Sequence, residues 1–94
     1  MITAIVLVET TVDRIPEVAQ QIADLPGVSE VYSVTGDVDL VAIVRVHEHD
    51  QLADVIADQL SKVDGVKSTR TYLAFRAYSQ HDLDDAFAIG FNGE

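Results

Sequence analysis

The sequence contains no cysteine and few cations, and these two shortages exclude several kinds of protein. Without cysteine, disulfide bonds and thiolate metal sites are excluded. Six Lys and Arg residues stand against 16 Asp and Glu residues, which gives a formal net charge of −10. Direct nucleic-acid binding is not expected of this chain, because phosphate contacts need clustered cations.

Long apolar runs and a basic leader are also missing. No apolar run reaches the about 18 residues that a membrane-spanning helix needs. No basic segment precedes an apolar one, so we expect no signal peptide, no membrane association and a cytoplasmic location. The 94 residues make one domain, and 48% of them are hydrophobic. A domain this small has a modest core, so the apolar surplus suggests contacts between subunits.

Two segments, 13–28 and 51–66, repeat one pattern of apolar residues that ends in Gly-Val. The spacing of the apolar residues predicts an amphipathic helix in each segment. The apolar stripes are Ile15, Val18, Ala19, Ile22 and Leu25 in the first helix and Leu52, Val55, Ile56, Leu60 and Val63 in the second.

The ends of both helices carry residues that favour helix boundaries. We expect Asp13 and Asp50 to be the N-caps, because their carboxylates can accept hydrogen bonds from free backbone N–H groups. Pro16 suits a first helical turn. Gly27 and Gly65 stand where the chain must leave each helix.

Runs rich in β-branched residues predict four strands, at residues 2–8, 28–34, 38–46 and 68–78. Gly36 and Asp37 lie between the second and third strands and form a short hairpin. The order βαββαβ with right-handed crossovers predicts an α+β fold of the ferredoxin-like kind. Such a fold has a four-stranded antiparallel sheet with both helices on one face.

A short helix is also predicted near the C-terminus. Leu83, Phe87 and Phe91 follow helical spacing. The sequence therefore divides into a domain of residues 1–79 and a helical tail of residues 80–94.

The predicted strands carry apolar residues on both faces. One face holds Ile2, Ala4, Val6, Val8, Leu40, Ala42, Val44 and Val46, and the other holds Ile5, Leu7, Val41 and Ile43. A sheet face left open to water should be polar. We therefore expect two chains to pair through their sheets, as in dimeric α+β barrels, with the tail covering part of that face.

The histidines offer a metal site or an enzyme as alternatives. His47 and His49 flank Glu48, and such a cluster can bind a divalent metal. We expect no metal and no catalytic residue here, because the spacing provides no third ligand and no nucleophile. A histidine inside a cavity between the sheet and the helices would favour an enzyme instead.

The segment Val34-Thr-Gly-Asp-Val-Asp-Leu40 can bind a small zwitterion. Gly36 can adopt a positive φ, which lets the turn present backbone N–H groups to a carboxylate. Asp37 and Asp39 can accept an ammonium group. The alternative is that both aspartates only satisfy the backbone of the turn.

The last predicted strand opens with Ser68-Thr-Arg-Thr-Tyr72. Its hydroxyl groups and Arg70 can bind a carboxylate, since arginine favours planar anions. The alternative is an ordinary polar strand, because Thr and Tyr favour β structure. Tyr32 and Tyr72 have the character of packing residues with a wet hydroxyl.

Together these segments resemble the ligand-binding (RAM) domain of the Lrp/AsnC, or feast/famine, regulators. The resemblance rests on the 34–40 segment, on Leu60-x-x-Val-x-Gly-Val66 and on Thr69-Arg-Thr-Tyr72, and it spans residues 2–78. It implies a ferredoxin-like fold, dimers paired through their sheets, and tetramers, octamers or rings of dimers. Full regulators carry an N-terminal helix-turn-helix, whereas the first strand here starts at Ile2, so the chain resembles a stand-alone form.

The resemblance also implies an effector site between dimers. It would consist of Gly36, Asp37, Asp39, Thr69, Thr71, Tyr72 and Tyr32. Asp39 would accept the ammonium group of an amino acid, and backbone N–H groups and Thr hydroxyls would bind its carboxylate. The expected function is therefore amino-acid sensing without cofactor or catalysis, in homo-oligomers or in assemblies with a full-length regulator. The alternatives are a small dimeric α+β barrel enzyme, similar to monooxygenases or isomerases, and a purely structural assembly module.

Overall fold

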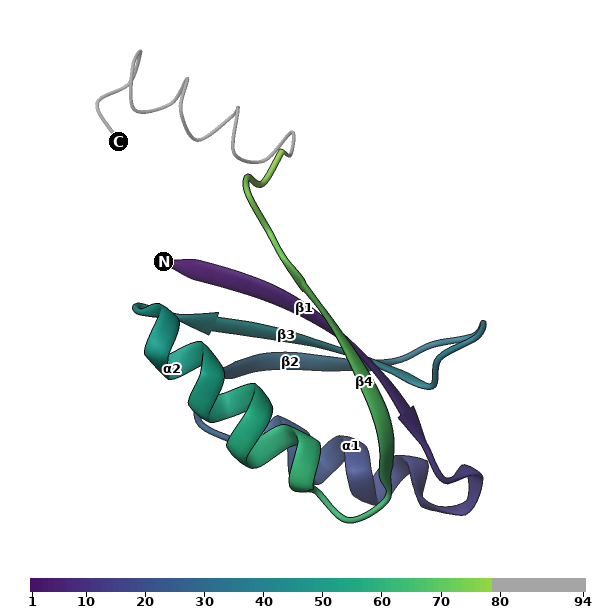
Figure 1. The fold of residues 1–94 in the computed structure, drawn as a ribbon. Coiled ribbons are helices and arrows are strands. Elements are labelled where there is room, and N and C mark those ends of the chain that lie inside the picture. The colour runs from purple at the N-terminus through teal and green to yellow at the C-terminus, as the bar shows by residue number, and fades with distance from the viewer. Residues whose placement is uncertain (79–94) are drawn as a thin grey trace, which may run out of the picture.

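The computed structural model describes residues 1–78, which form one antiparallel sheet with two helices on one face (Figure 1). The strands are ordered β2-β3-β1-β4 across the sheet. Their bounds are Ile2–Thr10 for β1, Val28–Ser33 for β2, Leu40–Val46 for β3 and Val66–Leu73 for β4. The predicted ferredoxin-like arrangement is confirmed. The predicted C-terminal helix falls in 80–94, outside the described residues.

The helices α1 (Ile15–Ala23) and α2 (His49–Ala53) follow β1 and β3. A 3-10 turn precedes α1, and α2 continues as a π-helical stretch and a second 3-10 turn; these segments are Val12–Arg14, Asp54–Gln59 and Leu60–Lys62. Within residues 1–78, no helix is both long and apolar enough to cross a membrane.

The predicted N-caps are wrong, although Pro16 does lie in the first turn of α1. Asp13 belongs to the 3-10 turn that precedes α1, so Arg14 takes the N-cap position. Glu48 rather than Asp50 caps α2. Its capping box pairs it with Gln51, whose Oε1 accepts the Glu48 backbone N–H at 3.0 Å. Because the capping partner Gln51 lies inside the helix, the cap is at Glu48, and Asp50 lies in the first turn of α2.

The core lies between the sheet and the helices. Its buried members are Ala4, Val6, Val8, Val18, Ile22, Leu40, Ala42, Val44, Val46, Val55 and Leu60. The remaining residues of the two predicted helical stripes are partly buried against this cluster. Both helix-ending glycines have positive φ, and a Cβ on Gly65 would lie 2.6 Å from the buried side chain of Val18.

Strand β4 ends earlier than the sequence predicted, at Leu73 rather than at Tyr78. Its partner β1 begins at Ile2, which lies two residues before the Ala4–Leu73 pair. After the Ala74 N–H bonds to the Thr3 carbonyl, the chain runs on past the sheet (Figure 1). Phe75 is consequently 99% exposed.

Candidate functional site

The loop between β2 and β3, residues 34–39, forms one side of the predicted site. The Val34 N–H bonds to the Asp39 carbonyl at 3.0 Å, which closes the loop at its base. Gly36 has φ +130°, and apart from its two chain neighbours no residue has an atom within 4 Å of where a Cβ would stand. The predicted positive φ is confirmed, and the glycine is open to an approaching ligand.

Asp39 attaches this loop to the end of β1. Its Oδ2 accepts the backbone N–H of Thr10 at 2.8 Å and lies 3.5 Å from the Thr10 hydroxyl. Its own N–H donates to the Val8 carbonyl at 3.0 Å. Asp39 therefore has a structural role in the single chain. Because both side-chain contacts involve Oδ2, that role leaves Oδ1 able to accept another donor.

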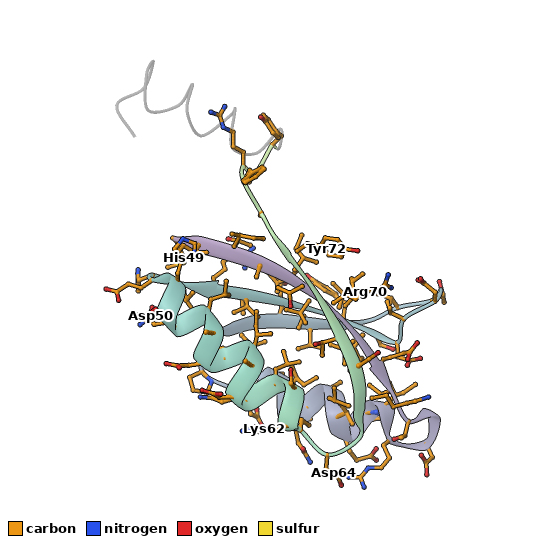
Figure 2. The ribbon with its side chains drawn as sticks, in the orientation of Figure 1. His49, Asp50, Lys62, Asp64, Arg70 and Tyr72 are labelled. Atoms are coloured by element: carbon orange, nitrogen blue, oxygen red, sulfur yellow. The ribbon has the colours of Figure 1, made fainter. Side chains whose placement is uncertain are left out.

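Asp37 points from the same loop toward β4. Its Oδ2 lies 3.3 Å from Nη2 of Arg70. The Asp37 side chain is 85% exposed and that of Arg70 is 54% exposed. Figure 2 shows Arg70 and Tyr72 on the side of the sheet away from the helices. The fold thus brings a carboxylate and a guanidinium together at the end of the open face.

The remaining predicted residues of β4 divide between its two faces. Thr69 and Thr71 stand opposite Val8 and Val6, which face the helices, whereas Tyr72 stands opposite Ile5 on the open face. Thr69 is half-buried, and Thr71 and Tyr72 are exposed. One chain therefore does not direct both threonines and Tyr72 to the same place.

Tyr32 lies on β2, at the other edge of the sheet. Across the sheet, Tyr32 pairs with Val41, Val41 with Leu7, and Leu7 with Arg70. Tyr32 and Arg70 are therefore three inter-strand spacings apart, about 14 Å. Its hydroxyl bonds to the Glu30 carboxylate, which raises the pKa of Tyr32 from 10.0. Within one chain, Tyr32 is not part of the Asp37–Arg70 end of the sheet.

The open face between these polar groups is apolar, as the sequence predicted. We call Ile5, Leu7, Val41 and Ile43 the open-face patch; all four are half-buried in the single chain. They occupy neighbouring positions on the two central strands, where Ile5 pairs with Ile43 and Leu7 with Val41. Tyr32 and Tyr72 flank the patch on the edge strands.

Two surface pockets lie away from the predicted site. One, of about 330 Å³, has walls that include Arg45 near the end of β3, His47 just after β3, and Asp54 and Gln59 from the helix begun by α2. The other, of about 250 Å³, lies between the start of β1 and the chain after β4. His47 is exposed and lines this pocket together with the core residues Val46 and Val55, where the end of β3 meets the helix begun by α2.

Among residues 1–78, no group of three or more His, Cys, Asp and Glu residues is placed to hold a metal ion. The His47-Glu-His49 segment lies at the start of α2, where all three residues are exposed. Figure 2 shows His49 and Asp50 at this end of the helix.

Arg70 is the residue that sequence reasoning left out of the site. The sequence identified it as able to bind a carboxylate, but its neighbour Asp37 is 33 positions away. The structure shows that the 34–39 loop reaches the last strand within a single chain.

The comparisons with known proteins agree with this fold. The family model for the Lrp/AsnC ligand binding domain matches residues 3–83. The regulator LysM of Saccharolobus solfataricus is 36% identical over 82% of this chain and 54% of its own length. The chain spans 39–54% of the length of the curated relatives that it matches, which are HTH-type transcriptional regulators.

Solved structures give the same result. TTHA0845 from Thermus thermophilus is 48% identical with a TM-score of 0.79, covering 85% of this chain and 100% of the other. The regulator NMB0573 of Neisseria meningitidis, solved as a complex with L-methionine, shares the fold at 16% identity, with a TM-score of 0.75 over 84% of this chain and 53% of its own. The chain belongs to the Lrp/AsnC family, in which it corresponds to the ligand-binding domain.

Proposed function

We propose that this chain is a cytoplasmic, non-enzymatic module that senses an amino acid and changes its state of assembly when the amino acid binds. The observation that carries this proposal is the 34–39 loop. It places an open Gly36 and the carboxylates of Asp37 and Asp39 at the end of an apolar sheet face. Family membership supports the proposal, and so does the methionine complex of the Neisseria meningitidis regulator.

The first step is pairing of two chains through the open-face patch. Four half-buried aliphatic side chains lie together in the middle of this face, and the exposed Tyr72 lies beside them. Covering them with a second sheet removes apolar area from water at about 25 cal/mol per Å². A twofold dimer is the simplest way to cover both copies, because one patch then serves both chains.

Further assembly of dimers, into tetramers, octamers or rings, completes the effector site. Thr69 and Thr71 point away from Tyr72, and Tyr32 lies at the opposite edge, so a neighbouring chain has to supply the missing walls. We assign the amino acid's ammonium group to Asp39 and Asp37. We assign the carboxylate of the amino acid to backbone N–H groups beside Gly36 and to the threonine hydroxyls.

Ligand binding then changes the assembly only through differential affinity. An amino acid that binds a dimer junction favours the larger assembly, whereas equal binding to both states would shift nothing. A coupling of about 1–3 kcal/mol is typical of such systems. The acidic chain would act on transcription by assembling with a full-length regulator, not by contacting DNA itself.

The test combines calorimetry with light scattering. The protein is titrated with each of the twenty L-amino acids, and its mass in solution is measured with and without each one. We expect heat from at least one amino acid and a change in mass on binding. Neither heat nor a change of mass with any of the twenty would refute the proposal.

A further inference from the structure

The pocket of about 330 Å³ at the end of β3 has an apolar floor. Val46 and Val55 line it from the sheet and from the helix, and Gly27 lines it from the loop before β2. A Cβ on Gly27 would lie 2.9 Å from Cγ2 of Val55 and 3.1 Å from Cγ1 of Val46, so a glycine is needed for the loop to lie this close. Both valines belong to the core between sheet and helices (Figure 1). Pairing of two chains through the open-face patch therefore leaves the pocket accessible.

The helix wall of the pocket comes from the π-helical stretch Asp54–Gln59. Both of its end residues line the pocket, although residues five positions apart are about 140° apart around an ordinary α-helix. The Leu60 N–H bonds to the Val55 carbonyl five residues earlier, which is the hydrogen bond of a widened turn. This turn brings Gln59 to the same side as Asp54. Such stretches are rare and are frequently found at functional sites.

Asp54 supplies the charge of the pocket. It is the one acidic residue among the described residues that line it, and within residues 1–78 no Lys, Arg or His nitrogen lies within 4.0 Å of its carboxylate. Arg45 also lines the pocket, but alternation along β3 directs its side chain to the open face, where Nη1 lies 3.6 Å from Oε1 of Glu30. Gln59 is half-buried and adds an amide oxygen. The pocket thus offers acceptors for a cation beside an apolar floor.

We propose that this pocket is a second ligand site, which binds a short primary alkylamine as its ammonium ion. The ammonium group donates to Asp54 and Gln59, and the alkyl chain covers Val46 and Val55. A volume of about 330 Å³ lies in the range of small-molecule sites and accommodates a chain of a few carbons. The net charge of −10 also favours the approach of a cation. The site shares no residue with the proposed amino-acid site.

The same residues distinguish an amine from related compounds. A carboxylate of the same length would meet the carboxylate of Asp54, and the guanidinium of Arg45 is directed to the other face. An alcohol of that length fills the apolar floor but brings no charge to Asp54. An α-amino acid carries its carboxylate beside its ammonium group, so it would add repulsion where the amine adds none.

The test is an NMR titration of the ¹⁵N-labelled protein with n-butylamine. Methylamine, n-butanol and butyrate are the comparison probes, because they change the chain length or the charge separately. Asp54→Asn and Asp54→Glu are titrated beside the wild type. The control is Asp58→Asn, which removes the same charge from an exposed residue of the same π-helical stretch that does not line the pocket. Thermal denaturation verifies that each variant is folded.

We expect n-butylamine to shift the amide signals of Gly27, His47 and Val55 and to leave that of Gly36 in place. Each methylene added between methylamine and n-butylamine should tighten binding up to about fourfold, which corresponds to about 0.8 kcal/mol for a buried methylene. n-Butanol should bind about tenfold more weakly than n-butylamine, and butyrate should cause no shift.

The variants should separate the pocket from the overall charge of the chain. Asp54→Asn should weaken n-butylamine binding about tenfold, the size of one lost charge-assisted hydrogen bond. Asp54→Glu should lose less, because it keeps the charge. Asp58→Asn should bind within about twofold of the wild type, since exposed charges outside the pocket are screened by salt.

Three results would overturn the proposal. One is the absence of saturable shifts at Gly27 and Val55 with n-butylamine. Another is equal weakening by Asp54→Asn and Asp58→Asn, which would mean that the amine responds only to net charge. The third is binding of butyrate as tight as that of n-butylamine. None of these results bears on amino-acid sensing, which is measured with other ligands at another site.

Discussion

Replacing Asp39 separates its structural role from its proposed role in binding. Asp39→Ala leaves the Thr10 N–H without its 2.8 Å acceptor, and Thr10 is only 3% exposed. An unsatisfied buried donor costs about 1–3 kcal/mol. Asp39→Asn keeps an oxygen that can accept the same N–H and loses only the charge of the acceptor, which costs about 1 kcal/mol.

These costs are large against the total stability of a domain this size. That total is about 0.05–0.15 kcal/mol per residue. At about 4–8 °C per kcal/mol, Asp39→Ala should lower the melting temperature by roughly 4–24 °C, and Asp39→Asn by roughly 4–8 °C. Protein concentration has to be equal in all samples, because assembly makes the melting temperature depend on it.

Amino-acid binding should respond differently to the two substitutions. Both remove the negative charge at position 39, so both should weaken binding of the ammonium group by a similar factor. Thermal denaturation and calorimetry on the same samples give the two readouts. Equal losses of stability in Asp39→Ala and Asp39→Asn would refute the hydrogen-bond argument, and wild-type binding by Asp39→Asn would remove Asp39 from the ligand site. Asp37→Ala is the control for stability, because it breaks only an exposed pair.

Three other predictions test the turns, the open face and the edge of the sheet. Gly65→Ala should lower the free energy of unfolding in urea by about 3 kcal/mol or more, because the new Cβ would lie 2.6 Å from a buried valine and the backbone has φ +100°. Gly36→Ala also strains a positive φ but meets no neighbour, so it should cost about 1–2 kcal/mol. Equal costs for the two variants would contradict the steric argument. Ile5→Glu should raise the dimer dissociation constant about a hundredfold or more in sedimentation equilibrium, because it places an unpaired charge on the open-face patch, and an unchanged constant would exclude this face as the interface. Because the pKa of Tyr32 is raised, its contribution to stability is complete below pH about 10 and is lost as the pH rises through the folded-state pKa. Glu30→Gln should lower the titration midpoint of the Tyr32 phenol toward 10.0 in an ultraviolet titration. An unchanged midpoint would rule out Glu30 as the cause.

The fold follows closely from the periodicity of the apolar residues. The stripe containing Val18 and Ile22 and the alternation along β1 assign residues to the core as the structure has them. What periodicity does not determine is where an element stops. The end of β4 depends on the start of β1, and the cap of α2 depends on Gln51, a partner that lies inside the helix.

The predicted site shows a different limit of sequence reasoning. The loop with Gly36 could be predicted, because its positive φ and its position between two strands are local properties. The two faces of β4 could also be inferred from alternation, which sends Thr71 and Tyr72 to opposite sides. The contact between Asp37 and Arg70 could not, because it depends on a strand order that brings the loop to a distant strand.

The position of β1 in the interior of the sheet affects how the chain can be made. β1 leaves the ribosome before both of its neighbours, because β3 and β4 begin only at Leu40 and Val66. Until then its backbone amides and both of its apolar faces have no partners, which is the condition under which nascent strands aggregate. Synthesis that stops before β4 would leave one edge of β1 open, so truncated products should be captured by chaperones or precipitate, while the full chain folds only after its last strand has emerged.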